Sequence, residues 1–358
     1  MKQYTSLYFV GAGGIGMSAL VRYFLAKGYK VAGYDRTQSP LTTELKTEGL
    51  EIVYEESVES IPDYCRNPET TLVVYTPAIP ASHAGLVYFR EHGFRVVKRA
   101  ELLGLITQSS RGLCFAGTHG KTTTSSMAAH IFHESPIGCN AFLGGILRNY
   151  NSNLILSEQS PFTVIEADEY DRSFHWLHPY MAVVTATDPD HLDIYGTEEA
   201  YLESFAHFTS LIQPGGCLIM KKGIRLVPNV KEGVKIYTYS ARDGGDFHAG
   251  NIRIGDGTIV FDFVTPEGVF ADIELGVPVE INIENAVAAM AIAWLNGVSG
   301  DNLRRAMASF KGAKRRFEFW VRRPDRVMID DYAHHPDELK ASILSLIHIS
   351  EPTRLRCI

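Results

Sequence analysis

Two glycine-rich segments constrain the fold of this chain most strongly, because each stands between a short apolar run and a helical pattern. The first covers residues 11–16, between the apolar run 7–10 and the pattern 15–27. The second covers residues 117–120, between the run 113–116 and the pattern 121–132. Glycine-rich turns from strand to helix are typical of doubly wound α/β domains, where they bind phosphate at the helix N-terminus. The sequence therefore predicts two α/β units, each with an anion site.

The remaining patterns continue the alternation of strands and helices, which predicts parallel, doubly wound sheets. Segment 234–274 is richer in strand patterns, and Gly-Asp-Gly at 255–257 indicates a hairpin. Polar residues 108–112 predict a linker, and the strand at 327–330 is interpreted as the opening of a third α/β domain. Further strands are expected at 30–34, 72–75, 95–97, 162–166, 181–185 and 217–220, and further helices at 100–108, 199–211 and 285–295.

Composition limits the class of protein. A chain of 358 residues suits two or three domains. The net charge of −7 gives no general attraction to nucleic acid or acidic membranes. The five cysteines form no C-x-x-C pair, and no apolar stretch approaches the length of a membrane span. We therefore expect a cytoplasmic enzyme in a reducing compartment, with neither nucleic acid nor membrane as partner.

The first glycine-rich loop reads Gly-Ala-Gly-Gly-Ile-Gly. Asp35 follows the next strand about 20 residues further on, where an acid that binds a ribose hydroxyl is found in dinucleotide-binding folds. By itself the pattern predicts NAD, and a tight turn without a ligand is the alternative. A nucleotide diphosphate is therefore expected, and its identity stays open at this point.

The second loop, Gly-Thr-His-Gly-Lys-Thr-Thr, is the more specific motif. Its backbone N–H groups are expected to surround phosphates, with Lys121 on the β- and γ-phosphates and the Thr122 hydroxyl on Mg²⁺. Phe115 stands where the general phosphate-loop pattern needs glycine, so that pattern fails by one residue. The Gly-Lys-Thr core still predicts ATP.

Acidic residues follow the strand expected at 162–166, and a histidine follows the one at 181–185. Carboxylates at the carboxyl end of a parallel strand lie near the phosphate loop of a neighbouring strand and suit a hard cation. Glu166, closest to its strand, is the best candidate. Asp168, Glu169 and Asp171 are explained equally well as a solvated acidic loop. His191 is interpreted as a metal or substrate contact, and His130 and His133 as ordinary helix residues.

Taken in order, these motifs resemble the Mur ligase family, and the similarity runs from about residue 5 to about residue 343. The short phosphate loop of that family accounts for Phe115. The resemblance also implies that the first loop binds a UDP-sugar and not NAD. The most specific matching segments are 13–18, 116–124, 166–169, 190–193, 315–317 and 331–336.

The resemblance implies three domains. These are a Rossmann-like UDP-sugar-binding domain at 1–108, a central P-loop-type ATPase α/β domain at 109–312, and the start of a C-terminal Rossmann-like domain at 313–343. Residues 344–358 do not continue the family pattern and look like translated sequencing adaptor. We therefore expect a truncated chain that is poorly active.

The implied reaction is the ATP-dependent joining of L-alanine to the carboxylate of UDP-N-acetylmuramate, through an acyl phosphate, in peptidoglycan precursor synthesis. A close alternative is a recycling ligase that attaches a tripeptide to the same sugar. A nicotinamide-dependent oxidoreductase is an alternative from another class, but it leaves the loop of Lys121 unexplained. A non-catalytic nucleotide-binding module is the third.

Residue roles follow from the same resemblance. Lys121, Glu166 and His191 are the expected catalytic residues, and Thr122, Glu166 and His191 the expected Mg²⁺ ligands. His334 or His335 is expected near the amino acid. Ile281-Asn282 replaces the His-Asn pair frequent in relatives, which implies a changed contact on the adenine side. The implied ATP contacts are Gly117, Thr118, His119, Gly120, Lys121, Thr122, Thr123, Asn282, Arg316 and Asp331, and the implied UDP-sugar contacts are Gly11, Gly13, Gly14, Ile15, Gly16, Asp35, Thr76 and Ala78.

Overall fold

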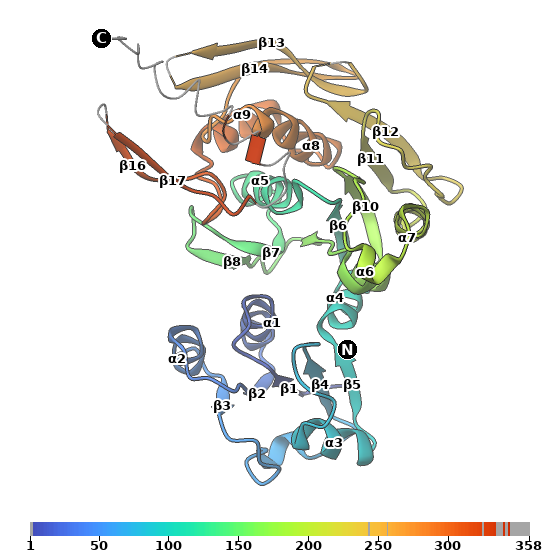
Figure 1. Ribbon diagram of the computed structural model, residues 1–358, viewed down its shortest axis with the longest axis vertical. Helices are drawn as coiled ribbons and strands as arrows, with labels where there is room; N and C mark the ends of the chain where they lie inside the picture. The colour runs from blue at the N-terminus through green and yellow to red at the C-terminus, as the bar shows by residue number, and fades with distance from the viewer. Residues whose placement is uncertain are drawn as a thin grey trace. The chain divides into compact units, whose positions relative to one another are not determined.

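The computed structural model describes residues 3–242, 244–255, 257–323, 326–333, 339–340 and 343. It forms two compact units, Met1–Ser110 and Arg111–Ile358 (Figure 1). Both are α/β units whose central strands pair in parallel, which confirms the predicted fold class. In the part of the chain that the structure describes, no helix is long and apolar enough to cross a membrane.

The first unit is a five-stranded parallel sheet in the order β3-β2-β1-β4-β5. Chain order reverses between β1 and β4, and ligands of doubly wound sheets bind at such a switch point, beyond the carboxyl ends of the strands. The glycine-rich loop leaves β1 at this place. The strands are β1 (Ser6–Val10), β2 (Lys30–Tyr34), β3 (Glu51–Val53), β4 (Thr71–Tyr75) and β5 (Arg95–Lys98), and the α-helices are α1 (Ile15–Ala26), α2 (Pro40–Thr47), α3 (Ala84–Glu91) and α4 (Arg99–Gln108).

The second unit is built on a ten-stranded sheet in the order β15-β14-β13-β12-β11-β10-β6-β9-β7-β8. Its centre is parallel, and antiparallel pairs close both edges. The strands are β6 (Arg111–Ala116), β7 (Asn140–Leu147), β8 (Ser152–Ile155), β9 (Phe162–Glu166), β10 (Pro179–Val184), β11 (Cys217–Lys221), β12 (Lys235–Ser240), β13 (Phe247–Gly255), β14 (Thr258–Thr265) and β15 (Gly268–Glu274).

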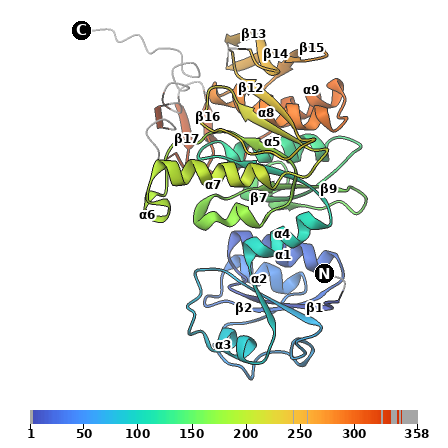
Figure 2. The ribbon, with the colours of Figure 1, turned by 90° about the vertical axis from the view of Figure 1, so that its right-hand side faces the viewer.

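Helices cover both faces of this sheet. Figure 1 shows β6, β10 and β11 between α5 and α8 on one side and α7 on the other, and Figure 2 shows β13–β15 extending one end of the sheet. A separate two-stranded sheet joins β16 (Glu318–Arg323) to β17 (Arg326–Asp330). The helices are α5 (Lys121–His133), α6 (Leu192–Tyr195), α7 (Glu198–Ser210), α8 (Ile281–Leu295) and α9 (Gly300–Ser309).

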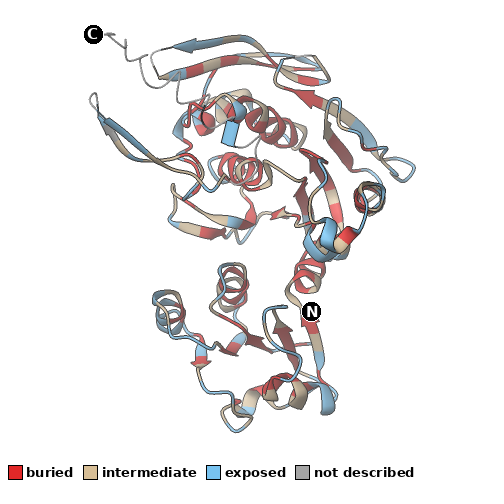
Figure 3. Ribbon diagram, viewed as in Figure 1, coloured by how far each residue is buried: buried red, intermediate tan, exposed pale blue. Residues whose placement is uncertain are grey.

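The core of the second unit depends on close packing of α5 against α8. Helix α8 is buried along most of its length, and alanine occupies many of its positions (Figure 3). Small side chains let two helices and a sheet approach closely without leaving voids. This packing fixes the start of α5, and therefore the phosphate loop, against the start of α8.

Two predicted boundaries were wrong. Strand β6 begins at Arg111, inside the predicted linker, because Arg111 N–H donates to Pro161 O and opens the pairing with β9. Helix α8 begins at Ile281, not at residue 285. Its first turn carries polar side chains that point into a cavity, so the turn has the composition of a loop although its backbone is helical. The hairpin predicted at 255–257 is confirmed by the antiparallel pairing of Gly255 with Thr258.

His130 belongs to a buried network on α5, in agreement with its interpretation as a structural residue. Its Nδ1 lies 2.7 Å from the Tyr150 hydroxyl and its Nε2 lies 2.9 Å from Ser309 Oγ. Tyr150 donates in turn to Glu134. Burial lowers the pKa of His130 to about 4, while Glu134 raises this pKa and His133 lowers it further. The ring is therefore neutral in the folded protein at neutral pH.

This network predicts an acid-sensitive contribution to stability. A histidine whose pKa is lower in the folded than in the unfolded state stabilises the fold above its unfolded pKa, near 6.5, and loses that contribution as pH falls towards 4. The loss is worth up to roughly 3 kcal/mol. We expect the melting temperature of the wild type to fall more steeply between pH 6.5 and 4 than that of His130→Gln. His92→Gln, at the exposed C-cap of α3 in the first unit, is the control and should keep the wild-type slope; equal slopes for all three proteins would contradict the prediction.

Candidate active site

The phosphate loop joins β6 to α5 at the edge where three parallel strands end. The register pairs Ala116 with Val184 and Phe115 with Glu166, so the ends of β10 and β9 flank the loop. Gly117 has φ +138°, and a Cβ there would lie 2.2 Å from Thr185 Oγ1. The loop therefore requires glycine at this position and packs directly on β10.

Lys121, the first residue of α5, makes three close contacts. Its Nζ donates to Gly117 O at 2.6 Å and lies 2.8 and 2.7 Å from the two carboxylate oxygens of Glu169. Glu169 is 1% exposed. Burial raises the pKa of the Glu169 carboxyl, and Lys121 opposes that shift. The sequence left Glu169 open between a metal ligand and a solvated residue; the structure places it in a buried ion pair.

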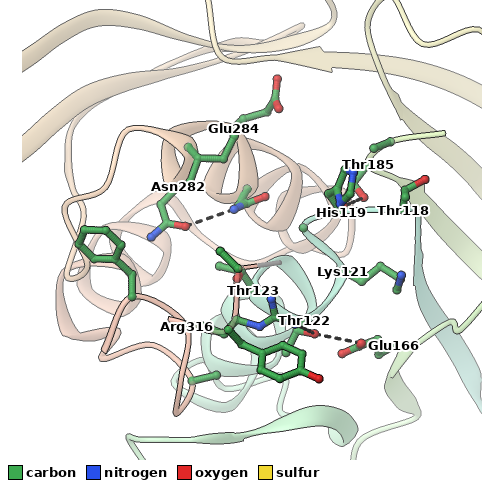
Figure 4. Close-up of a pocket in the computed structure, with 18 of the residues that line it drawn as sticks. Thr118, His119, Lys121, Thr122, Thr123, Glu166, Thr185, Asn282, Glu284 and Arg316 are labelled. Atoms are coloured by element: carbon green, nitrogen blue, oxygen red, sulfur yellow. Dashed lines mark hydrogen bonds between the residues drawn. The ribbon is translucent and has the colours of Figure 1, made fainter. Parts of the chain in front are cut away.

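Thr122 and Glu166 form an oxygen-rich pair beside this lysine. Thr122 Oγ1 donates to Glu166 Oε1 at 3.0 Å (Figure 4). Gly144 N–H donates to Glu166 Oε2 at 3.0 Å. Burial raises the pKa of the Glu166 carboxyl, while Lys121, Thr122 and Gly144 lower it. Hydroxyl and carboxylate oxygens at this separation are the donor types that a hard divalent cation takes.

A cavity of about 770 Å³ opens over these groups. Its size lies in the ordinary range of ligand pockets. One side is polar and carries the phosphate loop, whereas the other carries apolar side chains of the segment before α8, such as Val277 and Val279. Of the candidate residues, the lining includes Thr118, His119, Gly120, Lys121, Thr122, Thr123, Glu166, His191, Asn282, Arg316 and Asp331.

The first turn of α8 contributes a chain of amide contacts. Asn282 Nδ2 donates to Val277 O, and its Oδ1 accepts from Asn285 Nδ2 at 3.2 Å (Figure 4). Asn285 Oδ1 accepts from Thr124 Oγ1 at 3.1 Å, which ties α8 to α5. Asn282 thus lies in the cavity as expected, but part of its hydrogen-bonding capacity maintains the fold.

Arg316 enters the cavity from the segment after α9. Its Nη2 lies 3.5 Å from Thr122 Oγ1. The residues on either side, Arg315 and Phe317, have left-handed φ values of 58° and 51°. Such strain persists only where surrounding contacts hold the backbone. Here the turn between β7 and β8 supplies them: Arg148 N–H donates to Gly312 O, Asn149 Oδ1 accepts from Lys311 N–H, and Lys314 N–H donates to Ile146 O.

His191 and Asp331 also reach the cavity wall. His191 caps the short helix α6 with φ 52°, and its ring meets that of Tyr170 edge to face, 5.2 Å between centroids. Asp331 follows β17. Within the described ranges, no three His, Cys, Asp or Glu side chains gather as a metal cluster. His334 and His335, expected near an amino acid, and residues 344–358 lie outside the described residues.

The glycine-rich loop of the first unit is held by backbone bonds. Gly11 and Ala12 N–H groups donate to Tyr34 O, and Gly13 N–H donates to Asp35 Oδ2 at 2.7 Å. Gly11 has φ +90°, and a Cβ there would meet the Thr76 methyl at 2.6 Å. The N-cap of α1 is Gly14, which has no side chain to accept the first helical N–H groups.

This arrangement brings most of the candidate residues of that loop together at the switch point of the sheet. Asp35 and Thr76 adjoin the loop, at the ends of β2 and β4, and Ala78 is exposed two residues after Thr76. Asp35 accepts from the Thr37 N–H as well, so both of its oxygens already bind backbone N–H groups. In this conformation the Asp35 carboxylate stabilises the loop through these hydrogen bonds.

Sequence reasoning missed several residues of the cavity in the second unit. Lys221 and Glu284 form an ion pair of 2.8 Å on its wall, and Thr185 binds the loop through His119 O. Behind the lining, the buried Tyr201 supports the loop through its hydroxyl, 2.9 Å from Thr118 Oγ1. The position of Thr185 at the end of a parallel strand was the available signal; Lys221 and Glu284 carried none, because their strand and helix lie far apart in the sequence.

Family models match both units. The Mur ligase family catalytic domain matches residues 6–111, and the Mur ligase middle domain matches residues 115–293. The UDP-N-acetylmuramate–L-alanine ligase of Parabacteroides distasonis is 66% identical over 346 residues, which are 97% of this chain and 75% of the relative. The enzyme of the same name from Phocaeicola vulgatus is 63% identical over 341 residues, 95% of this chain and 74% of the relative.

Solved structures of Mur ligases superpose on this chain. The crystal structure of the UDP-N-acetylmuramate–alanine ligase of Thermotoga maritima superposes with a TM-score of 0.80 at 25% identity, over 96% of this chain and 78% of that chain. A murein peptide ligase from Psychrobacter arcticus gives a TM-score of 0.75 at 25% identity, over 96% of this chain and 76% of that chain. The chain belongs to the Mur ligase family.

Proposed function

We propose that this chain is an ATP-dependent ligase of peptidoglycan precursor synthesis, which joins L-alanine to the carboxylate of UDP-N-acetylmuramate. The observation that carries the proposal is the 66% identity to an enzyme of that name over nearly the whole chain. The cavity around Lys121 provides the cation and the loop that an ATP-dependent reaction needs. The reaction is placed in the cytoplasm.

The chemistry explains why cationic side chains lie beside the phosphate loop. A carboxylate is a poor acylating agent, so it is first converted into an acyl phosphate by attack on the γ-phosphate of ATP; the L-alanine amine then displaces phosphate to form the amide. Two anions have to meet in the first step, which requires fixed positive charge at the transferred group. Lys121 and Arg316 supply it, together with the N-terminus of α5.

Thr122 and Glu166 are proposed to hold Mg²⁺, with His191 as the third group facing the metal. The fit rests on the two oxygen donors, 3.0 Å apart, beside the phosphate loop. Mg²⁺ in nucleotide sites commonly takes only one or two protein ligands and completes its shell with phosphate and water, which agrees with so small a protein set. When bound, the cation neutralises charge that develops on the phosphate oxygens.

The UDP-sugar is assigned to the first unit. Beyond Gly13, whose N–H binds Asp35, the loop runs into the N-terminus of α1, which suits a diphosphate. Asp35, Thr76 and Ala78 are the proposed neighbours of the nucleoside and sugar. We further propose domains at 1–108, 109–312 and 313–343, with residues 344–358 as a non-native tail, and an amino-acid site at His334 or His335.

The recycling ligase for a tripeptide is the closest alternative. The solved murein peptide ligase and the solved alanine ligase both match at 25% identity, so these two structures do not separate the activities. The relative that is 66% identical over nearly the whole chain is named as an alanine ligase, which favours L-alanine. Family membership argues against a nicotinamide cofactor at the first loop, because the Mur ligase family model covers that loop and Asp35.

Ligand titration tests the proposal on the chain as it stands. Calorimetric titration with UDP-N-acetylmuramate should give saturable binding, and titration with NADH should give none. In a version extended to the full length of the relatives, of which this chain covers 75%, release of ADP should require ATP, UDP-N-acetylmuramate and L-alanine together, with the tripeptide as the competing amine. Saturable NADH binding, or preference for the tripeptide over L-alanine, would contradict the assignment.

A further inference from the structure

The ion pair between Lys121 and Glu169 bears on how nucleotide enters the site. An ammonium group has three N–H donors. In Lys121 one donates to Gly117 O at 2.6 Å and one to Glu169 Oε1 at 2.8 Å, while Glu169 Oε2 lies 2.7 Å from Nζ without accepting a hydrogen bond. The charge of the ammonium is therefore already paired with a buried carboxylate. Since Gly117 O belongs to the loop itself, the contact with which a nucleotide phosphate competes is the one to Glu169.

Glu169 itself is fixed in place. Its backbone carbonyl accepts from the Tyr195 hydroxyl and from Arg172 N–H. Asp171 and Arg172 adopt left-handed φ values of 51° and 53°, and the Arg172 guanidinium lies over the Tyr195 ring at 4.9 Å. A carboxylate held this firmly and almost fully buried does not retreat into solvent when the lysine finds another partner.

We propose that Glu169 is the resting counterion of Lys121, and that a nucleotide phosphate competes with it for the ammonium. The inference rests on the proposed binding of ATP at this loop. Glu169 acts through Lys121 and is therefore a positioning residue. It keeps the ammonium aligned beside the loop in the free protein, and it competes with phosphate for the same donor.

This competition predicts that a substitution at Glu169 increases the affinity for nucleotide. Replacing Glu169 by Gln removes the competing charge but keeps one oxygen for Lys121, so ATP and ADP should bind about tenfold more tightly. AMP has no β- or γ-phosphate for Lys121 to reach, so its affinity should change less than twofold. A residue with a merely structural role would weaken the binding of all three nucleotides when replaced.

The experiment is titration of wild type, Glu169→Gln and the control Glu284→Gln with AMP, ADP and a non-hydrolysable ATP analogue. Glu284 is a second carboxylate on the cavity wall, but it is paired with Lys221. Neutralising it tests whether removal of any nearby negative charge tightens binding. Glu169→Asp, which keeps the charge on a shorter side chain, should give an intermediate effect and serves if Glu169→Gln does not fold.

The titrations distinguish a role in nucleotide binding from a general charge effect and from a purely structural role. Tighter ATP and ADP binding confined to the Glu169 variants supports the proposal. Equal tightening in Glu284→Gln, or equal tightening for AMP, overturns it in favour of a general charge effect. Weaker binding of every nucleotide by a folded Glu169→Gln also overturns it. Failure of the wild type to bind ATP would instead refute the proposed function.

Discussion

Replacement of Lys121 by alanine should weaken ATP binding about 100-fold, because a charge-assisted contact to phosphate is lost. Turnover, measured as ADP release by a version extended to the full length of the relatives with both co-substrates present, should fall by about 10³-fold, since the same charge is needed where phosphoryl transfer develops negative charge. The binding of UDP-N-acetylmuramate, assigned to the other unit, should not change.

The same substitution should also destabilise the second unit. Without Lys121, Glu169 remains as a buried carboxylate with its ion pair broken. Breaking such a pair by removal of one partner costs roughly 3–5 kcal/mol. Loss of activity in Lys121→Ala could therefore come from unfolding alone, and a second variant is needed to separate the two causes.

The double variant Lys121→Ala/Glu169→Gln provides that separation. It removes the unpaired charge and should recover most of the lost stability, as measured by the denaturation midpoint in urea. It should not recover ATP binding, because the phosphate lysine is still missing. Recovery of nucleotide affinity in the double variant would remove Lys121 from the binding site.

The residues that sequence patterns located well are those placed by parallel strands. Lys121 and Thr122 follow one predicted strand, and Glu166 ends another. Because the carboxyl ends of parallel strands share one edge of the sheet, sequence order alone brings these residues together. The structure confirms their proximity through the bond between Thr122 and Glu166.

Glu169 could not be placed in this way. The direction of the Glu169 side chain depends on the 3₁₀ turn that follows it, Tyr170–Trp176, which contains left-handed residues. A pattern of polar and apolar residues does not encode such a turn. The pairing of Leu147 with Ala313 is also invisible to local patterns, because it joins residues far apart in the sequence. That contact helps to position Arg316, which the sequence assigned to ATP only through the family resemblance.

The start of α8 is a second place where sequence patterns did not predict the backbone conformation. Asn282, Glu284 and Asn285 are polar, so the segment resembles a loop. Their side chains line a cavity, while the backbone is already helical. Periodicity predicts a helix where one face meets an apolar core, and it fails where that face meets a ligand site.

Glu166→Gln is the second substitution with a large expected effect. The variant keeps the size of the side chain and its ability to accept from Thr122 and Gly144, so the fold should be retained. It lacks the negative charge that Mg²⁺ requires of a carboxylate ligand. We expect turnover to fall by a factor of about 10² to 10³, in the range found when one electrostatic contribution to a transition state is removed.

Direct measurement of cation binding distinguishes a metal ligand from a residue that only shapes the cavity. Binding of Mn²⁺, used as a paramagnetic substitute for Mg²⁺, should be tight in the wild type with a non-hydrolysable ATP analogue and weak in Glu166→Gln. Asp168→Asn, two residues away on the same loop, is the matched variant. If Glu166 is the ligand, Asp168→Asn should bind Mn²⁺ much more tightly than Glu166→Gln does, because its site keeps the carboxylate beside Thr122. If the two variants were equally impaired, the cation would be held by the acidic loop as a whole, and the oxygen pair of Thr122 and Glu166 would lose its assigned role.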